Sequence, residues 1–136
     1  MRVVSFVFVA VAAQFAFAAD QDAEARKGLI GTWEGRVDEG ATGHRLTFTA
    51  DLVKGTKDRK RDLGEGTFQL DLTKKPARMD ATGTKGSPKG KTYLGIFALE
   101  GDTLKWCVSL PGSERPTEFA TKDSQFLLIL KRQKDH

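Results

Sequence analysis

Alternation of apolar and polar residues constrains the fold of this chain more than any other feature. Trp33, Gly35 and Val37, for example, are separated by polar residues. Such a period of two places one set of side chains on a buried face and the other in solvent, which is typical of half-buried strands. The pattern predicts eight strands, over residues 32–37, 45–52, 68–72, 79–81, 91–99, 103–110, 117–120 and 125–132.

Glycine, proline and charge mark the connections between these strands. Lys54 to Glu65 carries five basic and three acidic residues with Gly55 and Gly64, and is predicted to be a solvated hairpin loop. Gly83 to Gly90 is a loop by composition, but it lacks the Lys-Ser/Thr ending and following helix of a phosphate-binding loop. Gly101 stands first in a two-residue connection, which favours a type II′ hairpin turn.

Short strands joined by hairpins, with no helix long enough for a βαβ crossover, predict an all-β fold. We expect one antiparallel up-and-down meander, closed into a small barrel over residues 29–133. The segments Tyr93 to Leu99 and Phe126 to Leu130 are apolar on both faces and need an outer cover. Either a helical turn over Ala23 to Leu29 or a dimer interface would provide it.

The N-terminus has the three parts of a secretion signal. Arg2 precedes an uncharged run from Val3 to Ala19, and Ala16 and Ala18 are small residues at the positions that signal peptidase reads. We expect residues 1–18 to be a cleaved signal peptide and residues 19–28 a short linker or helical turn. The alternative, an uncleaved anchor, is disfavoured because the run is short and contains Gln14. The mature protein is then periplasmic or extracellular, without stable membrane insertion.

Composition argues against several functional classes. The 22 basic residues are interleaved with 18 acidic ones and accompany no nucleic-acid-binding motif, so nucleic acid is not an expected partner. Cys107 is the sole cysteine, which excludes an internal disulfide and favours a buried, unreactive side chain. Two histidines without metal-ligand spacing predict neither a metal site nor a cofactor. His44, the one plausible catalytic base, is expected at a strand edge on the surface, with no Gly-x-Ser-x-Gly nucleophile nearby.

Two polar pairs are candidates for chemistry on the outside of the barrel. A hairpin centred near Lys75-Pro76 would place Asp71 opposite Asp80, and mutual repulsion would raise one pKa, as an acid/base hydrolase needs. The alternative is that Arg78, Lys74 or a backbone amide neutralises both carboxylates. Arg115 and Glu118 would either grip a polar ligand at the rim or form an ordinary surface ion pair.

Several motifs carry a family resemblance. Gly31-Thr32-Trp33 resembles the Gly-x-Trp signature of lipocalins, and Arg132 is placed like the basic residue that packs over the tryptophan in that family. More closely, Gly101-Asp102-Thr103-Leu104 and Arg115-Pro116-Thr117-Glu118-Phe119 resemble an uncharacterised family of secreted, lipocalin-like domains of planctomycete bacteria. The resemblance covers residues 29–132. It implies a fold, and no activity is established for that family.

The barrel interior is the remaining place for a site. Six aromatic residues are expected to converge there as tentative ligand-binding residues: Trp33, Phe48, Phe68, Phe97, Trp106 and Phe119. An eight-stranded barrel is either filled by its own side chains or holds one small ligand. The leading hypothesis is a non-catalytic, exported binding module for a small apolar or amphipathic molecule. The alternatives are a protein-interaction or inhibitor module acting on another exported protein through residues 54–65, 83–90 and 111–116, and a hydrolase using Asp71 and Asp80.

Overall fold

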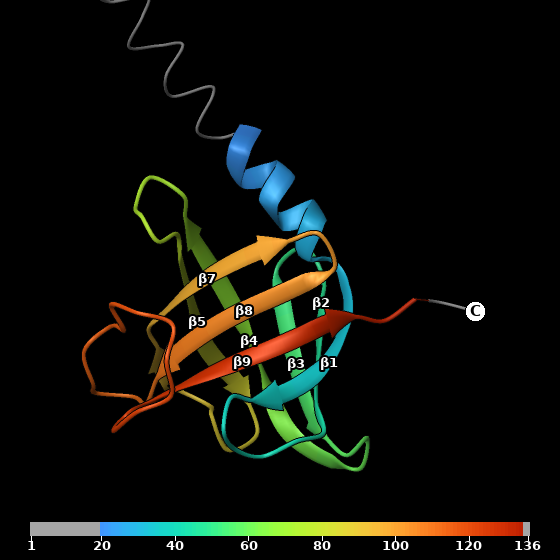
Figure 1. The fold of residues 1–136 in the computed structure, drawn as a ribbon. Coiled ribbons are helices and arrows are strands. Elements are labelled where there is room, and N and C mark those ends of the chain that lie inside the picture. Colours follow the sequence, from blue (N-terminus) through green and yellow to red (C-terminus); the bar gives the residue numbers. More distant parts are fainter. Residues whose placement is uncertain (1–19, 135–136) are drawn as a thin grey trace, which may run out of the picture.

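The computed structural model describes residues 20–134, which form one helix and nine strands (Figure 1). The helix covers residues 20–29. The strands are β1 (Gly31–Val37), β2 (His44–Phe48), β3 (Leu52–Lys57), β4 (Arg61–Asp71), β5 (Arg78–Lys85), β6 (Thr92–Tyr93), β7 (Gly95–Glu100), β8 (Thr103–Ser109) and β9 (Gln125–Arg132). The predicted strand 91–99 is therefore divided at Leu94: Thr92–Tyr93 pair with β5, and from Gly95 onward the chain pairs with β8.

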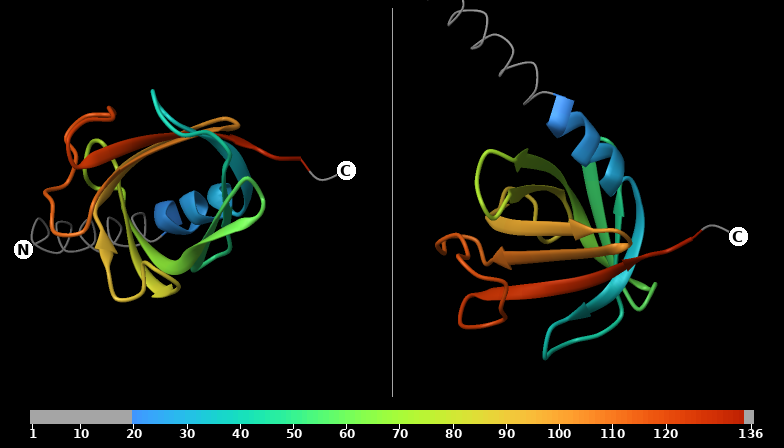
Figure 2. Two further views of the ribbon diagram at one scale, coloured as in Figure 1. Left: turned by 90° about the horizontal axis from the view of Figure 1, so that it is seen from below. Right: turned by 45° about the horizontal axis from the view of Figure 1, so that its top comes forward.

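The strands form a closed antiparallel barrel, as predicted. Their order is β4-β3-β2-β1-β9-β8-β7-β5-β6, and an additional β4–β5 pairing closes the ring. Eight strands complete the ring, and the two-residue β6 is an extra strand on β5. Seen along the barrel axis, the strands surround the interior and the helix lies across the far end (Figure 2, left). Closure leaves the ring without the two open edges of a flat sheet.

The helix closes one end of the barrel. Leu29 is fully buried in the main hydrophobic cluster, and the Arg26 guanidinium lies 4.7 Å from the centroid of the Phe68 ring. Beside it, the Arg132 guanidinium lies 4.3 Å from the centroid of the Trp33 ring and donates to the carbonyl of Gly28 at 2.6 Å. The predicted role of this segment as an outer cover was wrong, because its apolar side chain packs into the end of the ring.

The outer cover comes from the connection between β8 and β9. Ile96, Cys107 and Leu127 point outward and form a second buried cluster, against which Phe119 packs. The predicted strand 117–120 is therefore wrong: residues 110–121 contain no strand, and this connection folds back over the outer face instead of entering the ring.

The predicted loop over Lys54 to Glu65 is mostly strand. Residues up to Lys57 belong to β3, residues from Arg61 belong to β4, and a short turn at 58–60 joins them. Six of its eight charged residues are exposed, Lys57 and Glu65 are half-buried, and Gly55 and Gly64 are buried. The charged composition was misleading because half-buried strands carry polar residues on their outer face.

The predicted signal peptide, residues 1–18, lies outside the described residues. Within residues 20–134, no helix combines the length and hydrophobicity needed to cross a membrane.

Candidate functional site

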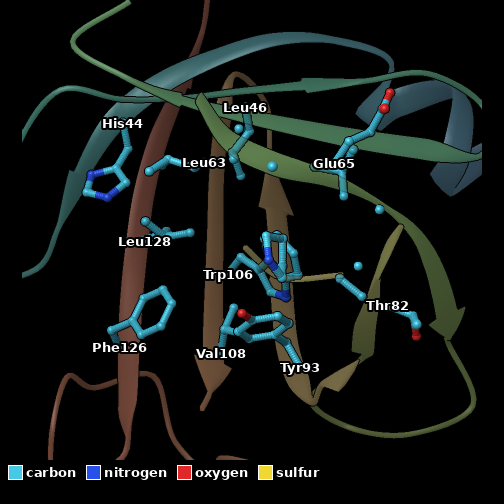
Figure 3. A pocket seen from close by; sticks show the side chains of 17 residues that line it. His44, Leu46, Leu63, Glu65, Thr82, Tyr93, Trp106, Val108, Phe126 and Leu128 are labelled. Atoms are coloured by element: carbon cyan, nitrogen blue, oxygen red, sulfur yellow. The ribbon is translucent and has the colours of Figure 1, made fainter. Parts of the chain in front are cut away.

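The barrel interior contains a pocket of about 210 Å³, lined by residues near the β1–β2 and β3–β4 connections at the end opposite the helix. Its wall comes from the ends of strands that meet there, with His44, Leu63 and Phe126 among the lining residues. Most of the lining is apolar. Figure 3 shows Trp106, Val108 and Tyr93 at the centre of the view, with Phe126 and Leu128 on one side and Glu65 and Thr82 on the other.

Four glycines form part of the pocket wall; a Cβ at Gly66 or Gly83 would lie 2.4 Å from the Thr82 carbonyl oxygen or 1.9 Å from the Pro88 carbonyl oxygen, so these two allow close backbone packing. Gly55 lies opposite Gly64, and Gly66 lies opposite Gly83, so two glycine pairs occupy neighbouring positions of β3, β4 and β5. All four line the pocket. A Cβ at Gly55 would lie 3.3 Å from Leu46 Cδ2 and 3.4 Å from Leu63 Cβ, so a side chain there would enter the pocket. Sequence reasoning missed these glycines as site residues, although their clustering in residues 55–66 was the available signal.

Of the six predicted aromatic residues, Trp106 lines the pocket. Trp33, Phe48, Phe68 and Phe97 belong to the same buried cluster but fill the barrel instead of lining its open space. Phe48 meets Phe68 edge to face at 5.3 Å between ring centroids and lies 6.3 Å from Trp106. Phe119 is outside the ring, against the second cluster, so its predicted place in the interior was wrong. The barrel is thus filled toward the helix and hollow at the opposite end.

His44 is the titratable residue of most interest in the pocket wall. It lies at the start of β2, as predicted, but it is half-buried and its Nδ1 is buried without a hydrogen-bond partner, so it is less exposed than predicted. Burial lowers the pKa of its imidazole, and the charge of Lys57 lowers it further, against a smaller opposing effect of Asp58. Burial and the nearby cation both disfavour the charged imidazolium, so the neutral ring is favoured.

Three other polar side chains of the pocket wall already have partners. The Trp106 Nε1 donates to the Met79 carbonyl at 3.1 Å, and the Thr82 and Thr92 hydroxyl oxygens lie 3.3 Å apart. Glu65 Oε2 lies 3.4 Å from Lys85 Nζ. The lining therefore offers an apolar surface with few free polar groups, which matches the general character of small-molecule pockets.

The predicted carboxylate pair does not form. Asp71 lies opposite Arg78, whereas Asp80 lies opposite Gln69, so the hairpin register differs from the predicted one. Asp80 instead binds Arg115 through both oxygens and accepts the N–H of Gly95 at 3.1 Å. Hydrogen bonds from Thr73 lower the pKa of Asp71. Neither carboxylate has the shared, repulsive environment that an acid/base couple needs.

The predicted pair of Arg115 with Glu118 is also absent from the structure. Arg115 binds Asp80 and the Gly95 carbonyl, and Glu118 binds Lys122. Within residues 20–134, no three His, Cys, Asp or Glu side chains gather as they would around a metal ion. Cys107 is buried, and burial raises the pKa of its thiol.

Comparison with protein-family models, with curated proteins and with solved structures finds no match for this chain.

Proposed function

We propose that this protein is an exported, lipocalin-like binding module that carries a small apolar or amphipathic molecule and performs no catalysis. The observation that carries the proposal is the apolar pocket of about 210 Å³ inside the closed barrel. A barrel whose own side chains filled both ends would leave no such space. Here four glycines of β3, β4 and β5 line one end of the barrel without adding side chains to it.

The volume limits the size of the ligand. An apolar cavity of roughly 150 Å³ accommodates benzene, whereas drug-sized ligands occupy pockets of about 300 Å³ or more. A pocket of about 210 Å³ therefore suits a monocyclic molecule or a short alkyl chain. A polar head group would remain at the open end, near His44.

Two further observations support the lipocalin-like and exported parts of the proposal. The cation of Arg132 over the Trp33 ring is the contact that the Gly-x-Trp resemblance implies for the closed end of the barrel. Arg2, the uncharged run and Ala18 form the pattern of a secretion signal.

Binding of benzene and of octan-1-ol to the purified mature protein tests the proposal. We expect saturable shifts of the Val108 and Leu128 amide signals by NMR. Ala81→Phe places a ring in the pocket wall and should abolish those shifts. Ala98→Phe is the matched control, because Ala98 lies on β7 outside the pocket lining and next to the buried Phe97.

A larger side chain in the core can destabilise the fold, so a second variant that obstructs the pocket is needed. Gly55→Val adds a smaller side chain toward Leu46 and Leu63, and circular dichroism should show an intact fold. Binding that persists in both folded variants, or that is lost equally in Ala98→Phe, would contradict a site inside the barrel. Native mass spectrometry of protein purified from its own cells would then identify the carried molecule by mass.

A further inference from the structure

A second hollow, on the outer face of the barrel, is lined by cations. It has a volume of about 300 Å³ and lies between the connection from β4 to β5 and the Arg115–Thr117 segment. Its basic lining residues are Lys74, Lys75, Arg78 and Arg115, and no acidic side chain lines it.

The hollow forms where two strands of the ring separate. β5 and β7 share a single register pair, Arg78 with Ile96, and β5 then continues toward β6. The Arg115–Thr117 segment crosses this seam, and the two hydrogen bonds of Arg115 to Asp80 hold it there. Segments about 40 residues apart in sequence thus meet around one concave surface.

The charge of the hollow is not balanced by the protein. Arg115 is neutralised by Asp80, but Lys74, Lys75 and Arg78 form no ion pair within residues 20–134. The carboxylate of Asp71 lies opposite Arg78 in the hairpin, and the charges of Lys74 and Arg78 act on it. Counting both carboxylates, four cations face two anions and leave a net charge of +2.

We propose that this outer hollow binds a phosphate group carried by a small organic molecule. Two lysine ammonium groups supply point charges, and the Arg78 guanidinium supplies a planar fork that binds two oxygens of one phosphate. The hydroxyl of Thr117 is a further donor in the lining. Pro76, Ile96 and Pro116 provide an apolar surface for the organic part of the ligand. This site is separate from the barrel pocket and does not depend on the function proposed for it.

Titration with inorganic phosphate and with phenyl phosphate, at constant ionic strength, tests the proposal. We expect saturable shifts of the Ile96 and Thr117 amide signals by NMR, with tighter binding of phenyl phosphate because its ring contacts the apolar surface. The triple variant Lys74→Gln, Lys75→Gln, Arg78→Gln should weaken binding at least about tenfold, since hydrogen bonds between charged groups each contribute about this much.

The matched control removes three other exposed lysines that also form no ion pair among the described residues: Lys54, Lys89 and Lys91, each changed to Gln. Both triple variants lose the same charge, so general electrostatic attraction would weaken equally in the two. Equal weakening of phosphate binding in the two triple variants would overturn the proposed site. Amide shifts that follow ionic strength without saturating would overturn it as well. Equal affinities for phosphate and phenyl phosphate would overturn the organic ligand.

Discussion

His44 connects the chemistry of the pocket wall to the stability of the fold. The pKa of its imidazole is lowered in the folded protein, so at pH values near the ordinary pKa of about 6.5 the unfolded chain binds more protons. The contribution of His44 to stability is therefore fully present above that pKa and is lost as pH falls through the folded pKa. Asp71 and Glu118 have lowered pKa values of their own, and their contributions change at lower pH than this window.

We predict that the free energy of unfolding decreases between about pH 7 and pH 5 and that His44→Gln reduces this decrease. Urea unfolding at several pH values measures the effect. Two neighbouring charges give opposite controls for the titration: Lys57→Gln should raise the pKa of His44, and Asp58→Asn should lower it further. An identical pH dependence in the wild type and His44→Gln would contradict the assignment to this residue.

Among the secondary-structure elements, the helix over residues 20–29 differs most from its predicted role. A short linker or helical turn was predicted here, with the outer apolar face of the sheet as one surface that it could cover. In the structure, Leu29 is fully buried at the end of the barrel, and the adjacent Ile30 is 45% exposed. The spacing of apolar residues in this short segment does not indicate which apolar surface the helix covers. The choice of surface depends on how the barrel closes.

Leu29→Ala should lower the free energy of unfolding by about 2–5 kcal/mol, because it removes buried methyl groups and leaves a cavity. Ile30→Ala removes a similar volume at the next position and should change stability by less than about 0.5 kcal/mol. Urea unfolding of the two variants measures the difference. Similar losses in both would mean that the helix contributes little to closing the barrel.

Strands were predictable where large side chains occupy the inner positions. Alternation located β1 and β8 because Trp33 and Trp106 face the core, and a run that is apolar on both faces located β9. It failed for β3 and the start of β4, since Gly55, Gly64 and Gly66 occupy buried positions without adding a hydrophobic signal. The same glycines line the pocket. The pocket wall was therefore hard to predict, because its glycines add no hydrophobic signal to the sequence. The aromatic residues that were predicted belong mostly to the filled half of the barrel.

The molecule as a whole has apolar residues on both sides of part of its sheet. The interior cluster fills the ring, while the second cluster lies under the connection from β8 to β9, with Phe119 as its cover. Sequence patterning indicated that Phe126–Leu130 needed a cover, but a contact formed by an irregular connection leaves no periodic signal. The register of the 71–80 hairpin was missed for a similar reason, because the chain can turn at several places around Lys75-Pro76.

We predict that Phe119→Ala makes Cys107 more reactive toward a thiol reagent. Cys107 Sγ lies 3.4 Å from the Ala120 carbonyl oxygen, and burial raises the pKa of the thiol. Removing the Phe119 ring should loosen the segment and admit solvent, so the rate of modification should rise. Phe97→Leu, a change in the interior cluster, is the control for general destabilisation. An unchanged rate in Phe119→Ala would show that the cover does not depend on this ring.

The barrel is divided into a half filled by side chains and a half that contains the pocket. This division separates the packing that stabilises the fold from the open space that a ligand would need. Trp33, Leu29 and Phe68 supply buried surface at the helix end, and the glycine pairs at the other end contribute almost none. On the function proposed above, amino-acid replacements around the barrel pocket would alter which molecule is bound, while the packed half at the helix end stays intact. Changes of ligand during evolution would then require no compensating gain in stability.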